Sequence, residues 1–148
     1  MSLAENHRAG FDYELVEKYE AGLELRGFEV KALRAGKATL VGAHIIIRGG
    51  EVYLVGATIQ PYQANNTPAG YEPSRTIRLL LTKKEINTLI GQSASRDLTI
   101  IPLSVYNKNG RLKLSFALAR RKKKFDKREK IKQRETDREL RRTLKKEF

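Results

Sequence analysis

The residues best suited to a chemical task are cations near the C-terminal end of the sequence. Residues 120–128 read Arg-Arg-Lys-Lys-Lys-Phe-Asp-Lys-Arg, which is seven cations, one carboxylate and one aromatic ring. Cations neutralise phosphates, and an aromatic ring stacks on an exposed base. An aspartate can cap the first free N–H groups of a helix. These residue types indicate binding to a polyanion rather than bond breaking.

Groups that catalysis or metal binding would need are not arranged for it. The sequence has no cysteine, which excludes disulfides, thiolate zinc sites and cysteine nucleophiles. His7 and His44 are single and far apart, and no Lys-Ser or Lys-Thr follows Gly49-Gly50 as in a phosphate-binding loop. We therefore predict a protein that is not an enzyme and has no cofactor and no metal.

Positive charge is concentrated at one end of the chain. Residues 120–148 hold 15 Lys and Arg against 6 Asp and Glu, whereas residues 1–119 hold 15 against 11. This asymmetry predicts a nucleic-acid partner. A membrane is not expected, because no apolar run approaches the roughly 18 residues of a span. The polar start and the lack of cysteine predict a cytoplasmic protein without a signal peptide.

Hydrophobic periodicity predicts a mainly β fold in three segments. These are a polar, partly mobile segment at 1–12, a β body at 13–119 and a basic tail at 120–148. The body is long enough for one core and is expected to form a small closed barrel or a sandwich. Six short strands are expected at 13–25, 39–48, 51–59, 75–81, 98–106 and 111–119, and two short helices at 26–35 and from Thr82 to about Gly91.

Local signals mark the boundaries of these elements. Gly49-Gly50 and Asn109-Gly110 predict hairpin turns. Thr82 with Glu85 three residues later is a capping-box pattern. The tail has high helix propensity and a thin apolar stripe, so we expect a helix that orders on its partner. From composition alone, a solvated tail that binds polyanions nonspecifically is the favoured interpretation.

Four groups of residues, in order along the chain, carry a resemblance to a known family. They are Tyr19 to Leu23 with Glu29-Val30-Lys31 and Leu33 to Lys37; Pro73, Arg75-Thr76 and Leu79 to Leu81 with Lys84-Glu85-Ile86; Pro102-Leu103, Tyr106, Lys108-Asn109-Gly110 and Lys113; and Lys122-Lys123, Asp126-Lys127-Arg128 and Ile131-Lys132. Together they resemble the SsrA-binding protein (SmpB) family from about residue 6 to 134. Arg121 departs from the family, which usually has glycine there.

The resemblance implies an oligonucleotide-binding (OB) type closed barrel that grips the tRNA-like domain of transfer-messenger RNA. It also implies a tail that enters the empty decoding centre and mRNA channel of a stalled ribosome during trans-translation. One copy of the protein per RNA is expected. The resemblance assigns RNA binding to Asn6, Glu20, Leu80 and Lys113, and Glu29, Lys31, Arg34 and Lys37 are further candidates for RNA binding. The candidates for ribosome binding are Lys122, Lys123, Lys124, Phe125, Asp126, Lys127, Arg128, Ile131 and Lys132.

Simpler interpretations of these residues remain open at this point. Leu80 is better explained by core packing than by contact with a base. Glu29 and Lys31 form an ordinary surface pair in the simplest interpretation, worth under about 1 kcal/mol. Glu20 cannot bind phosphate, but it can accept from a 2′-hydroxyl or orient a neighbouring cation. The alternative function is a ribosomal or ribosome-assembly protein whose basic extension binds ribosomal RNA.

Overall fold

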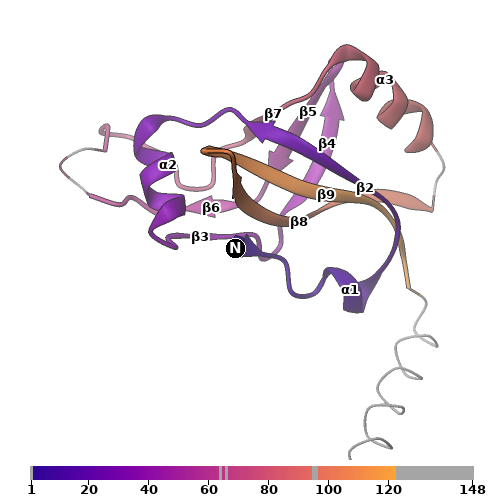
Figure 1. Ribbon diagram of the computed structural model, residues 1–148, viewed down its shortest axis with the longest axis horizontal. Helices are drawn as coiled ribbons and strands as arrows, with labels where there is room; N and C mark the ends of the chain where they lie inside the picture. The colour runs from indigo at the N-terminus through magenta and orange to yellow at the C-terminus, as the bar shows by residue number, and fades with distance from the viewer. Residues whose placement is uncertain (1, 64, 66, 95–96, 123–148) are drawn as a thin grey trace, which may run out of the picture.

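The computed structural model describes residues 2–63, 65, 67–94 and 97–122 (Figure 1). This part of the chain contains nine strands and three short helices, which confirms a mainly β fold. In chain order they are β1 (Ser2–Glu5), α1 (Ala9–Asp12), β2 (Tyr13–Leu23), α2 (Gly27–Arg34), β3 (Ala38–Thr39), β4 (His44–Arg48), β5 (Glu51–Val55), β6 (Thr58–Ile59), β7 (Ile77–Leu80), α3 (Lys83–Gln92), β8 (Leu98–Lys108) and β9 (Arg111–Arg121).

A seven-stranded antiparallel sheet forms the body, in the order β1-β8-β9-β2-β7-β5-β4. The three longest strands, β2, β8 and β9, lie side by side at its centre (Figure 1). The N-terminal residues join this sheet, because β1 pairs with β8 and Ala4 and Ala9 are buried.

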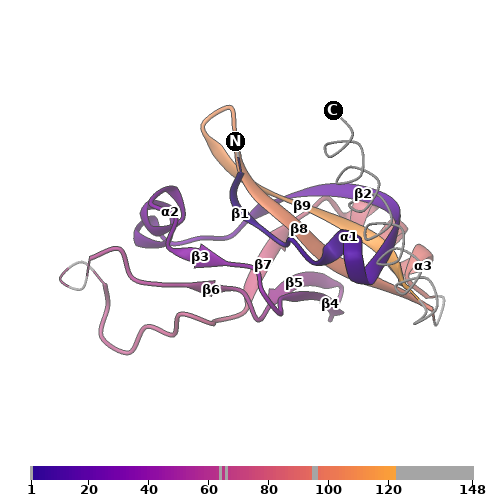
Figure 2. The same ribbon diagram turned by 90° about the horizontal axis from the view of Figure 1, so that it is seen from below.

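The expected closed barrel is not found in the described residues. The sheet curls so that β4 lies against β8, but no ladder of strand hydrogen bonds joins them (Figure 2). β1 and β4 are therefore two edges of an open, curled sheet. The strand count exceeds the expected six because β1 was not predicted and two predicted strands are each divided.

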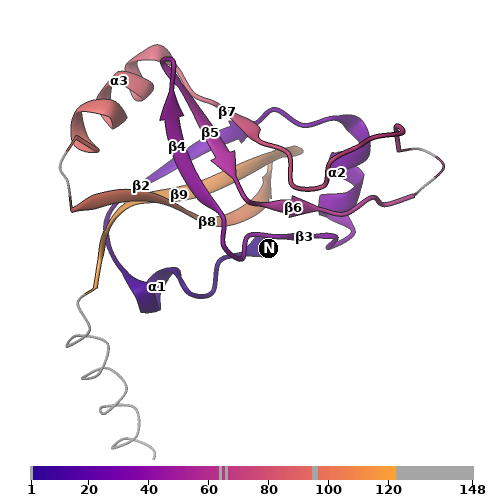
Figure 3. The same ribbon diagram turned by 180° about the vertical axis from the view of Figure 1, so that it is seen from behind.

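The two divided strands bend at glycines. The predicted strand 39–48 becomes β3 and β4, and the predicted strand 51–59 becomes β5 and β6. Gly56 has φ +84°, and a Cβ there would lie 3.2 Å from the carbonyl oxygen of Gly42. Because L side chains rarely adopt this conformation, the bend needs glycine. β3 and β6 then pair as a separate two-stranded sheet below α2 (Figure 3).

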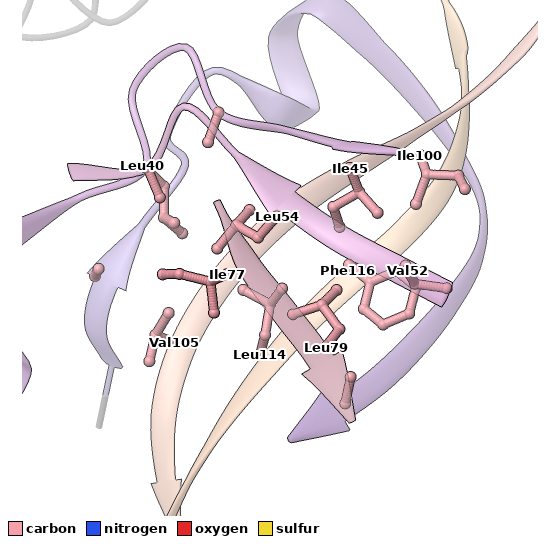
Figure 4. Close-up of a cluster of buried hydrophobic side chains, with 14 of the residues drawn as sticks. Leu40, Ile45, Val52, Leu54, Ile77, Leu79, Ile100, Val105, Leu114 and Phe116 are labelled. Carbon is pink, nitrogen blue, oxygen red and sulfur yellow. The ribbon is translucent and has the colours of Figure 1, made fainter. Parts of the chain in front are cut away.

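The inner face of the curled sheet carries the core. Leu112, Leu114, Phe116 and Leu118 alternate along β9, as the sequence predicts, and all four are buried. Figure 4 shows Phe116 and Leu114 packed among apolar side chains from β4, β5, β7 and β8. Burial of one such side chain contributes about 1.5–3 kcal/mol, so this face fixes the register of the central strands.

Strand β9 ends two residues later than predicted. Arg121 pairs with Tyr13, and the backbone N–H of Lys122 donates to the carbonyl of Asp12 over 3.0 Å. Arg120 also forms an ion pair with Asp97 at 3.4 Å. The sheet therefore includes Arg120 and Arg121, which the sequence assigns to the tail.

Candidate nucleic-acid interface

A row of side chains crosses the outer face of the sheet. Tyr106 on β8 is opposite Lys113 on β9, Lys113 is opposite Gly22 on β2, and Gly22 is opposite Leu80 on β7. Directly opposed residues of antiparallel strands point to the same side of a sheet. The row therefore places a phenol, an ammonium group and an isobutyl group on one surface.

Leu80 lies on this surface with 47% of its side chain exposed, so the preference for core packing is wrong. A Cβ at Gly22 would lie 3.2 Å from the Cβ of Leu80, so the glycine lets Leu80 lie close over β2. Leu80, Lys113, Arg34 and Arg111 together line one groove, with Gly22, Leu23, Leu25, Val30, Gly110 and Leu112. We call this the outer groove.

Glu20 lies next to this row on β2 and is held by two partners from β8. Its carboxylate accepts hydrogen bonds from the Tyr106 hydroxyl and from Lys108 Nζ at 3.1 Å. The hydrogen bond from Tyr106 is the main cause that lowers the pKa of Glu20, with help from Lys108. Burial and the same carboxylate raise the pKa of Tyr106 to about 12. Near pH 7 Glu20 is therefore an anion that orients a phenol and a cation.

Lys113 on β9 lines the outer groove together with Arg34 and Arg111. It has no ion-pair or hydrogen-bond partner within the part of the chain that the structure describes. Its charge contributes to the lowered pKa of both Glu20 and Glu85. Lys113 is half-buried on β9.

Helix α2 brings two more cations to this region. Arg34 Nη2 donates to the carbonyl of Gly110 over 3.2 Å, which ties the helix to the β8–β9 turn. Lys31 is exposed three residues earlier, near Arg34 on the helix surface. Lys37 is exposed beyond the end of the helix, and its carbonyl accepts from the N–H of Gln60 over 2.8 Å.

Glu29 is not a surface residue, which corrects both its expected RNA contact and its expected surface pairing with Lys31. Its side chain is 0% exposed and accepts from Arg75 Nη2 at 2.6 Å and Nε at 2.8 Å. It also accepts from the Tyr71 hydroxyl at 3.0 Å and from the N–H of Arg26 at 2.8 Å. Burial alone would raise its pKa, but these donors, Arg75 foremost, lower it. Glu29 therefore fastens α2 to the loop before β7.

Asn6 lies apart from the outer groove. Its side-chain amide donates to the carbonyl of Pro102 over 2.9 Å, and its backbone N–H donates to the carbonyl of Leu103. It lines a different pocket, with His7, Tyr13 and His44 among others. These contacts join the N-terminal segment to β8.

Of the residues assigned to ribosome binding, Lys122 is described by the structure. Its Nζ donates to the carbonyl of Gly10 over 2.9 Å, so in this structure its side chain contacts α1. The other residues assigned to ribosome binding lie outside the described residues. They are Lys123, Lys124, Phe125, Asp126, Lys127, Arg128, Ile131 and Lys132.

Four residues that organise this region were not among the predicted site residues. Arg75 and Tyr71 hold Glu29, and Tyr106 and Lys108 hold Glu20. The predicted β8–β9 hairpin places Lys108 beside its turn, but the approach of Lys108 to Glu20 also needs the pairing of β2 with β9. Glu29 and Arg75 are 46 residues apart, and no local pattern links them.

Across the described residues, no helix is long and apolar enough to cross a membrane. In the same residues, no group of three or more His, Cys, Asp or Glu side chains is arranged to hold a metal ion.

Comparison with known proteins identifies the family. A family profile described as "SmpB protein" matches residues 3–146. The chain belongs to the SmpB family. Among its SmpB relatives, the SsrA-binding protein of Gloeothece citriformis is 45% identical over 143 residues, which cover 97% of this chain and 92% of that protein. The SsrA-binding protein of Verminephrobacter eiseniae is 47% identical over 97% of this chain and 91% of its own length.

A solved SmpB structure has a similar fold. It is described as "tmRNA-SmpB: a journey to the center of the bacterial ribosome", and the matching chain is 44% identical with a TM-score of 0.66. The match covers 81% of this chain and 84% of that chain. The family predicted from the four groups of residues is thus confirmed.

Proposed function

We propose that this protein is an RNA-binding adaptor that binds the tRNA-like domain of transfer-messenger RNA. In this proposal it delivers that RNA to stalled ribosomes for trans-translation, in the cytoplasm and without catalysing a reaction. The observation that carries the proposal is the similarity to the SmpB chain of the tmRNA-SmpB structure, at 44% identity. The names of the SsrA-binding relatives point to the same partner.

The outer groove supports this proposal with suitable chemistry. Structured RNA is bound mainly through its shape, its phosphates and its 2′-hydroxyls. Lys113 and Arg34 supply cations for phosphates, and exposed Leu80 supplies an apolar surface for a base or ribose. Glu20 cannot bind phosphate, so its role is to hold Lys108 and Tyr106 in place beside the groove. One protein copy then binds one RNA.

The tail is proposed to act on the ribosome rather than on the tRNA-like domain. Residues 120–148 carry a net charge of +9, and the decoding centre and mRNA channel are lined by RNA phosphates. Lys123, Lys127 and Arg128 neutralise phosphates there. Phe125 stacks on a base, and Asp126 starts a helix that forms on binding.

Truncation tests the two roles together. A chain that ends at Lys122 keeps β9 and the bond to Gly10, so we expect it to retain most of its affinity for the isolated tRNA-like domain. In a reconstituted rescue reaction it should no longer support tagging. A full-length variant with Lys127 and Arg128 changed to Gln keeps the chain length and should also lose tagging.

Two outcomes would contradict the proposal. Normal tagging by the truncated chain would show that the tail has no role. Copurification of ribosomal subunits without transfer-messenger RNA would instead favour a ribosomal or ribosome-assembly protein.

A further inference from the structure

A second pocket lies between α2 and the long loop that follows β6. Phe28 and Lys31 of α2 line it with Tyr62 and Gln63 of the loop, and Gly27 completes its wall. Tyr62 is 46% exposed, and Phe28 is half-buried. None of these residues lines the outer groove, and the proposed function above assigns no role to either ring. We call this the aromatic pocket.

Phe28, which lines the pocket, is held in place by contact with Tyr71. The ring of Phe28 packs edge-on against Tyr71, with centroids 4.8 Å apart and planes at 88°. The Tyr71 hydroxyl in turn donates to the carboxylate of buried Glu29. The same hydroxyl oxygen lies 3.1 Å from the carbonyl oxygen of Ile59, which is a second acceptor. Burial and Glu29 raise the pKa of Tyr71 to about 12, so this hydroxyl stays protonated near pH 7.

The loop wall is tied to the body on both sides of Tyr62. Before it, the N–H of Gln60 donates to the carbonyl of Lys37 over 2.8 Å. After it, Arg75 bonds to Glu29, and the N–H of Ile59 donates to the carbonyl of Pro73 over 2.9 Å. Because these bonds fix both ends of the loop, the two rings are brought to one pocket before any ligand binds.

Helix α2 connects the aromatic pocket to the outer groove. Arg34 lines the groove and Lys31 lines the pocket, and residues three apart are neighbours on a helix surface. A phosphate backbone that leaves the groove along α2 therefore meets a second cation beside two aromatic rings. Among the residues that the structure describes, no carboxylate lines the pocket.

We propose that the aromatic pocket binds one unstacked nucleobase of the RNA, against Phe28 and Tyr62, with the adjoining phosphate at Lys31. Loops of structured RNA offer such bases, and aromatic rings bind them with little sequence preference. This inference rests on the proposed RNA-binding function and adds a site to it. A peptide partner is less suited, because the cations of α2 make one positive path from groove to pocket.

Exposed Tyr62 gives the cleanest test, because its replacement removes little buried surface. Tyr62→Leu keeps an apolar side chain and loses the ring, so affinity for the isolated tRNA-like domain should fall about fivefold or more. Tyr62→Phe keeps the ring and should bind like the wild type. Arg48→Gln is the control, because Arg48 is exposed at the β4–β5 turn and lines neither the pocket nor the groove.

The salt dependence of RNA affinity distinguishes the contribution of the Tyr62 ring from that of the Lys31 charge. Tyr62→Leu should leave the slope of log K against log salt unchanged, whereas Lys31→Gln should make it shallower by about 0.7–0.9. Chemical probing of the bound RNA should show one nucleotide that is protected by wild type and Arg48→Gln and exposed with Tyr62→Leu.

The outcomes distinguish this inference from the function on which it rests. A wild-type protein that does not bind the tRNA-like domain overturns the proposed function and the pocket together. If the wild type binds and Tyr62→Leu binds equally well with an unchanged probing pattern, the rings merely cover the loop and the pocket inference is wrong.

Discussion

Two carboxylates of this protein have nearly the same partners and opposite surroundings. Glu20 accepts from a tyrosine and a lysine on the outer face of the sheet, and Glu29 accepts from a tyrosine and an arginine in the interior. Both have a lowered pKa. Glu29 is completely buried, whereas the side chain of Glu20 is 36% exposed.

Burial decides what such a cluster contributes. When a buried charge loses its partner, no water is present to take the partner's place. The Glu29 cluster therefore stabilises the fold and fixes the loop before β7. Water can replace the partners of Glu20, so its cluster contributes little to stability and instead shapes a surface that RNA can reach. Glu20 and Glu29 belong to the same group of family-like residues in the sequence, but one is exposed on the sheet and the other is buried.

The largest expected effect is on stability at the buried cluster. Glu29→Gln removes the charge of the carboxylate that pairs with Arg75, which should lower the free energy of unfolding by about 2–3 kcal/mol. This is below the full cost of breaking a buried pair because the Arg75 side chain is 24% exposed. Urea unfolding measures the change. Glu24→Gln is the control, because that carboxylate is 59% exposed and should change stability by less than about 0.5 kcal/mol.

The same cluster predicts a pH dependence. The pKa of Glu29 in the folded protein is lowered from its usual 4.5. Its contribution to the free energy of unfolding is therefore fully present above pH 4.5. The contribution is lost as pH falls through the folded pKa. The stability gap between wild type and Glu29→Gln should stay constant from about pH 7 to pH 5.5 and shrink below about pH 4.5. A gap that widens in acid would contradict this account.

The smallest expected stability effect is at the exposed carboxylate. Glu20→Gln should leave the free energy of unfolding nearly unchanged, because water replaces the partners of an exposed carboxylate. It releases Lys108 and Tyr106 from a fixed arrangement, so we expect the affinity for the tRNA-like domain to fall a few-fold. Binding titrations and urea unfolding on the same variant measure both quantities. A large loss of stability with unchanged affinity would make Glu20 a second structural residue and remove the contrast with Glu29.

Local patterns predicted the local structure well. The capping box at Thr82 and Glu85 is present, with the N–H of Thr82 donating to Glu85 at 3.0 Å and the N–H of Glu85 to the Thr82 hydroxyl at 3.2 Å. The Asn109-Gly110 turn lies where expected, with positive φ at both residues. Alternation along β9 identified its buried face. Each of these features depends on residues within a few positions of one another.

Predictions that needed long-range pairing were less successful. Leu79, Leu80 and Leu81 form an unbroken apolar run, which does not reveal which leucine faces the core. The answer lies in the pairing of β7 with β2, where Leu80 sits opposite Gly22 on the outer side. The burial of Glu29 likewise follows from a partner in a distant loop. Sheet closure depends on how the edge strands meet, which no single strand encodes.

The most direct test of the account compares affinity and stability in one variant, Lys113→Gln. Lys113 lines the outer groove without an ion pair in the described residues, so its loss should leave unfolding in urea unchanged within about 0.5 kcal/mol. Affinity for the isolated tRNA-like domain should fall, and the salt slope should become shallower by about 0.7–0.9. Unchanged affinity and slope in a fully folded Lys113→Gln protein would contradict the assignment of the outer groove to RNA.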